Sequence, residues 1–66
     1  MSDANEHRYD TGQTVWLMLF GHEIMGTIEE VLTHPNPERT THYLVEYEHE
    51  DVRYRTAFPE YRIYTG

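Results

Sequence analysis

Histidines and carboxylates are the side chains of this chain that could do chemistry, because both can carry protons and bind metals. The five histidines are scattered, and none pairs with another at a spacing typical of metal ligands: His7, His22, His34, His42 and His49. The acidic runs Glu29–Glu30 and Glu48–Asp51, the second of which encloses His49, are most simply solvated. We therefore predict no metal site.

Covalent and acid–base catalysis also lack their usual parts. The chain has no cysteine, no Ser–His–Asp order and no glycine loop of the kind that cradles phosphate. A domain of 66 residues, filled by its own side chains, rarely has a pocket for a substrate. We therefore predict a protein that is not an enzyme and holds no cofactor.

The charge balance points to a class of partner. Twelve carboxylates face five arginines and no lysine, which gives a net charge of −7. Such a chain repels a polyanion, so direct binding of nucleic acid is not expected, and a basic protein surface fits better. The acidic rim expected to steer that partner comprises Glu23, Glu46, Glu48, Glu50 and Asp51. The alternative is that acidity only keeps a small protein in solution.

Hydrophobic alternation predicts strands over 13–20, 23–34, 41–49 and 51–58, then a tight turn over 59–61 and a closing strand over 62–64. The segment 34–41 contains two prolines and is predicted to be an exposed loop. Residues 1–8 are expected to form a flexible arm, and 9–66 one domain. Arg53 and Arg55 are expected across from Glu46 and Glu48.

The second strand has a broken register, because Ile28 and Val31 have opposite parity. A β-bulge at Glu29 and Glu30 would return Val31 to the core side. Gly26 marks a bend or a close approach of backbones. A helix through 23–32 is the alternative, which Gly26 and the β-branched residues disfavour.

The first strand is apolar on both faces. Val15, Leu17 and Leu19 alternate with a second set, Trp16, Met18 and Phe20. Only one of these faces is needed for a core, so the second must be covered by the N-terminal arm, another subunit or a partner. This second set is the predicted apolar centre of a binding surface.

The spacing Gly12-x-x-Val15-Trp16, Gly26-x-Ile28, Tyr43-x-Val45-x-Tyr47 and Glu60-x-x-Ile63 resembles SH3-like barrels of the Tudor and KOW type. The resemblance covers residues 9–65 and implies a small five-stranded antiparallel barrel with a 3₁₀ turn before its last strand. The layout is also similar to the plasmid-type dihydrofolate reductase, but that family's Val-Gln-Ile-Tyr run has no counterpart here. No reductase is predicted.

A Tudor-like barrel suggests an aromatic cage for a methylated lysine or arginine, because cations bind over ring faces. The candidate rings are Trp16, Tyr43, Tyr47, Tyr54 and Tyr61. The alternative is that most of these tyrosines pack in the core or across strands.

These observations lead us to expect a non-catalytic protein-binding or adaptor module with an acidic surface and a basic protein partner. The alternatives are a structural homo-oligomer built on the first strand and, more weakly, a Tudor-like or KOW-like ligand-binding barrel. The sequence has no apolar run long enough to cross a membrane and no signal peptide, which predicts a cytoplasmic protein. A small accessory protein of a phage or mobile element is the expected setting.

Overall fold

The computed structural model describes residues 8–33 and 40–65. They form one antiparallel sheet of five strands in the order β4-β3-β2-β1-β5. The elements are β1 (Thr14–Leu19), β2 (His22–Leu32), β3 (His42–His49), β4 (Val52–Pro59), the 3₁₀ turn η1 (Glu60–Arg62) and β5 (Ile63–Tyr64). The predicted all-β fold of five antiparallel strands, with a 3₁₀ turn before the last strand, is confirmed. The predicted loop over 34–41 and the predicted arm over 1–8 lie mostly outside the described residues.

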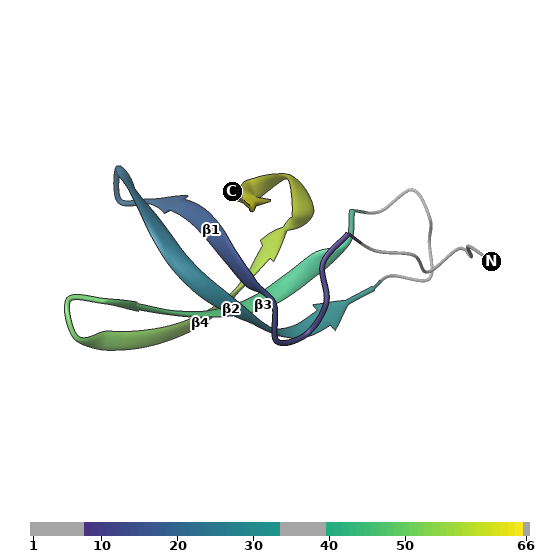
Figure 1. The fold of residues 1–66 in the computed structure, drawn as a ribbon, viewed down its shortest axis with the longest axis horizontal. Coiled ribbons are helices and arrows are strands. Elements are labelled where there is room, and N and C mark those ends of the chain that lie inside the picture. The colour runs from purple at the N-terminus through teal and green to yellow at the C-terminus, as the bar shows by residue number, and fades with distance from the viewer. Residues whose placement is uncertain (1–7, 34–39, 66) are drawn as a thin grey trace.

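The sheet is curved, and the β1–β2 and β3–β4 hairpins spread apart toward their tips (Figure 1). Its inner face carries the core, whose buried members are Tyr9, Val15, Leu17, Ile28, Tyr43, Val45, Tyr47, Phe58 and Ile63. The alternation predicted for the first and third strands therefore places the expected side chains inside. We call the opposite face of the sheet the outer face.

The second strand contains the predicted β-bulge. Ile28 pairs with Val45 and Glu30 pairs with Leu44, so Glu29 is the extra residue. Beyond the bulge, Val31 pairs with Tyr43 and packs against the core, as predicted. The bulge thus corrects the parity of the apolar residues along β2.

Gly26 is a position of close approach, as predicted. A Cβ atom at this residue would lie 2.5 Å from Val45 Cγ1 and 3.1 Å from the Glu46 carbonyl oxygen. Only glycine lets β2 and β3 come together here without displacing a core side chain.

Both hairpins turn through two residues with positive φ. Phe20 has φ 53° and Gly21 has φ 77°, while Glu50 and Asp51 have φ 53° and 65°. Two positive φ angles are typical of type I′ turns, which suit the twist of antiparallel strands. The prediction that the first strand extends to Phe20 was wrong, because this residue belongs to the turn.

The chain crosses from β4 to β5 through η1. Pro59 ends β4, and the Glu60 N–H donates to the Thr41 carbonyl oxygen at 3.0 Å. The turn occupies Glu60–Arg62, one residue later than predicted. Within 8–33 and 40–65, no helix has the length and apolar character needed to span a membrane.

Candidate protein-interaction surface

The structure separates the three residues of the predicted apolar centre, Trp16, Met18 and Phe20. Met18, which is 51% exposed, and the half-buried Trp16 share the outer face of β1. Met25 lies beside them on β2, in register with Trp16, and is 58% exposed. Sequence reasoning missed Met25, although its parity relative to the half-buried Ile24 indicated an outward position. The outer apolar patch is therefore Trp16, Met18 and Met25.

Phe20 does not join this patch, which corrects the expected face of the first strand. Its ring is stacked on His49 with the centroids 4.3 Å apart and the planes at 18°. His49 is the last residue of β3, next to the β3–β4 turn, so this stack connects the turn regions of the two hairpins. Phe20 is nevertheless 58% exposed.

Four of the five predicted rim carboxylates come together in one open hollow. We call this hollow, of about 620 Å³, the acidic hollow; it is lined by Glu23, Ile24, Met25, Glu48, Glu50 and Asp51. The pairing of β2 with β3 begins at Gly26 and Tyr47. Residues 22–25 of β2 pair with β1 instead, so β2 and β3 are not joined beside the hollow. The two hairpins diverge from that point, and their carboxylates flank the opening.

The carboxylates of the acidic hollow are largely unneutralised. Within residues 8–33 and 40–65, no ion pair engages Glu23, Glu48 or Asp51. Glu50 lies 3.7 Å from His49 Nε2, an ion pair only when the histidine is protonated. The described residues that line the hollow include no lysine, arginine or histidine. Met25 and Ile24 therefore lie among negative charges.

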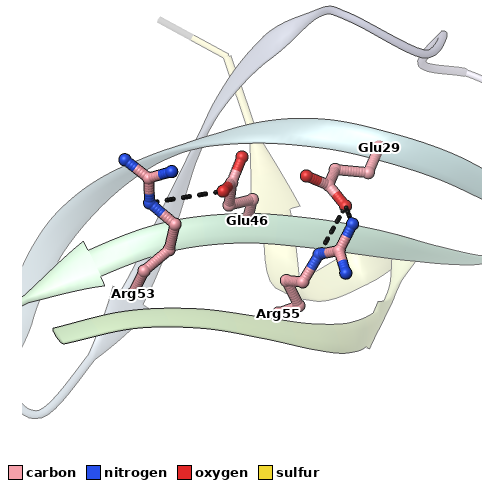
Figure 2. A network of polar contacts seen from close by, with 4 residues as sticks. All are labelled: Glu29, Glu46, Arg53 and Arg55. Carbon is pink, nitrogen blue, oxygen red and sulfur yellow. Dashed lines mark hydrogen bonds and ion pairs between the residues drawn. The ribbon is translucent and has the colours of Figure 1, made fainter.

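Glu46, the fifth predicted rim residue, belongs to a different cluster (Figure 2). Arg53 Nε lies 3.3 Å from Glu46 Oε2. Arg55 Nε and Nη2 both reach Glu29 Oε1, at 2.7 and 2.6 Å. The expected register is confirmed, since Glu46 pairs with Arg55 and Glu48 with Arg53, but the side chains cross diagonally to other partners.

The bulge explains the choice of Glu29. As the extra residue of β2, it presents its carboxylate on the outer face, within reach of Arg55 two strands away. The hydrogen bond from Arg55 holds the pKa of Glu29 below its usual value. The outer face thus has a neutralised half near β4 and an acidic half near the hairpin tips.

Glu23 is held in place by Tyr64, which sequence reasoning did not identify. The Tyr64 hydroxyl donates to Glu23 Oε2 at 2.6 Å, from β5 to β2 across β1. The bonded carboxylate raises the pKa of Tyr64. Trp16 lines the same shallow depression as these two residues. The aromatic side chains therefore connect the outer apolar patch to the acidic hollow.

The five candidate cage rings do not converge. Tyr43 and Tyr47 are core residues, and Tyr54, 37% exposed, stacks on Tyr47 with centroids 5.3 Å apart. Tyr61 is 79% exposed on η1, and Trp16 lies on the outer face. These rings therefore occupy three separate places in the fold.

Tyr43 holds the N-terminal end of the described chain. Its hydroxyl donates to Glu60 Oε2 at 2.6 Å and accepts the N–H groups of Arg8 and Tyr9 at 3.0 and 3.3 Å. Burial and the neighbouring Glu60 carboxylate raise the pKa of Tyr43. The Tyr9 hydroxyl donates to the Ile63 carbonyl oxygen at 3.2 Å, so this network is structural.

The acidic hollow and the outer apolar patch offer two kinds of contact to a ligand. In the described ranges, no group of three or more histidines or carboxylates is arranged to hold a metal ion. The carboxylates of the acidic hollow can accept hydrogen bonds from cations, and the methionines beside them offer apolar contact. Comparison of the chain with protein-family models, with curated proteins and with solved structures gives no match.

Proposed function

We propose that this protein is a non-catalytic binding module that recognises a basic segment of another protein. The observation that carries the proposal is Met25, which is 58% exposed in a hollow whose described lining has four carboxylates and no cation. An exposed apolar centre inside a rim of one charge is suited to a partner that supplies both apolar and cationic side chains.

The two halves of this surface have different roles in the proposal. Burial of Met18, Met25 and Trp16 supplies affinity, since apolar surface removed from water contributes about 25 cal/mol per Å². The exposed carboxylates supply steering and selectivity, because exposed ion pairs add little stability but increase association rates.

A second copy of this chain is a poor occupant of the same surface. In a symmetric dimer the identical patch of both subunits meets. The four carboxylates of the hollow would then oppose those of the other copy, and the described lining residues include no cation that could neutralise them. The homo-oligomer built on the first strand is therefore not the function we propose.

The test is a titration with designed peptides, followed by the fluorescence of Trp16, the only tryptophan. A peptide in which lysine and arginine alternate with leucine is compared with a glutamate–leucine peptide of the same length. The proposal requires binding of the basic peptide only, weakened by added salt. Equal binding of both peptides, or of neither, contradicts it.

Variants locate the binding. Met25→Ser and Asp51→Asn should each weaken binding of the basic peptide. Glu30→Gln is the matched control, because Glu30 is an exposed carboxylate of β2 that does not line the acidic hollow. If Glu30→Gln and Asp51→Asn lose equal affinity for the basic peptide, net charge alone attracts the peptide.

A further inference from the structure

β4 is an edge strand that is exposed on both faces. Residues 52–57 are all exposed, including Val52 at 49% and Tyr54 at 37%, and β3 is the strand that pairs with β4. An exposed edge of this length offers a row of backbone groups to another strand.

The turn before β4 fixes which backbone groups face outward. Glu50 and Asp51 form a two-residue turn, and His49 pairs with Val52 directly beside it. The pair that closes such a hairpin is hydrogen-bonded, and the pattern then alternates. Val52, Tyr54 and Thr56 therefore bond to β3. Arg53, Arg55 and Ala57 direct their N–H and C=O groups to the open edge.

The charged side chains of β4 do not guard this edge. Arginine on an edge strand normally opposes pairing with another copy. Here Arg53 and Arg55 turn back over the sheet to Glu46 and Glu29, and Figure 2 shows both guanidinium groups lying over β3 and β2. The two arginines of β4 are therefore engaged in ion pairs within their own chain, on the outer face beside the middle of the strand.

We propose that β4 pairs antiparallel with β4 of a second copy, centred on Arg55. In this register Arg53 lies opposite Ala57 of the second copy, and Arg55 lies opposite Arg55. The backbone groups of all three outward-facing residues of each copy then form hydrogen bonds with the other copy. A shift by two residues in either direction opposes one of them to Asp51 in the turn or to Pro59, which has no N–H.

A second copy is favoured over a foreign strand by what the register matches. On the inner face it places Tyr54 beside Thr56 and Val52 beside Phe58, which are stabilising aromatic and β-branched pairs. Glu23, Met25 and Glu48 of the acidic hollow lie outside the paired strand, so the dimer would present two binding surfaces.

Cysteine cross-linking tests the register, because the chain has no cysteine. Opposed hydrogen-bonded residues have Cα atoms about 5.5 Å apart, within the range of a disulfide. Arg55→Cys should form a covalent dimer under mild oxidation. Arg53→Cys is the matched control, since it also loses an arginine but faces Ala57. Equal cross-linking at the two positions, or none at position 55, overturns the proposal.

A second pair of variants tests the role of the turned-back arginines by sedimentation equilibrium. Glu29→Gln leaves Arg55 unneutralised opposite its copy, so the dimer dissociation constant should rise about two- to fivefold. Glu46→Gln, which frees the arginine opposite Ala57, should change it less. Added salt should strengthen the dimer, because it screens the repulsion between two chains of the same net charge. Binding of the basic peptide should become weaker in added salt. A wild-type chain that stays monomeric at millimolar concentration overturns the dimer and leaves the proposed function standing.

Discussion

The ring of Phe20 lies flat against the ring of His49, 4.3 Å between centroids, and so links the β1–β2 turn to the end of β3. Phe20 lies in the turn of the first hairpin, and His49 is the residue before the turn of the second. Phe20 has a φ of 53° as the first residue of its type I′ turn, although bulky residues rarely occupy that region.

Phe20→Asn separates the contribution of the ring stack from the cost of placing Phe20 in the turn. Asparagine before Gly21 is favoured in a type I′ turn, so the melting temperature should be unchanged or higher despite the lost ring contact. The ring-current shifts of the His49 protons in the NMR spectrum should disappear. A marked fall in melting temperature would show that the stack outweighs the turn strain.

Gly26→Ala should destabilise the sheet. The new methyl group would lie 2.5 Å from Val45 Cγ1, and overpacking of this kind typically costs about 1–3 kcal/mol. Urea denaturation measures the change. The double variant Gly26→Ala, Val45→Ala should lose less than the two single changes combined, and strict additivity would argue against the clash.

Tyr43→Phe should destabilise the fold by about 1–3 kcal/mol, because the buried Tyr9 N–H would lose its acceptor. The same hydroxyl predicts a pH effect. The pKa of Tyr43 is raised in the folded protein, so its contribution to stability is complete below the unfolded tyrosine pKa of about 10 and is lost as pH rises through the folded value.

The measurement is urea denaturation of both proteins from pH 8 to pH 11. Wild type should lose stability more steeply than Tyr43→Phe at the alkaline end of this range. Parallel curves would show that Tyr43 has no raised pKa.

Much of the fold was predictable from sequence because it depends on parity and turn residues. Ile28 and Val31 indicated the bulge, and Gly26 indicated the close approach, both of which the structure contains. Phe20 was misplaced because alternation continues through it, while its positive φ arises from the turn and from a contact with distant His49.

The outer face was harder to predict, because side chains there reach diagonally over a twisted sheet. Arg55 pairs with Glu46 in the sheet, as expected, yet its side chain bonds Glu29, the extra residue of the bulge. The grouping of four carboxylates around Met25 depends on where β2 and β3 diverge. No single segment of sequence contains that information.

Chemical-shift mapping with the basic lysine/arginine–leucine peptide tests the central claim most directly. We expect amide shifts to change at Glu23, Met25 and Glu48–Asp51 and along the outer face of β1 near Trp16 and Met18, with little change at Val45 or Thr56. Changes confined to the inner face at Val52 and Tyr54, or no changes at millimolar peptide, would contradict a basic-segment site on the acidic hollow.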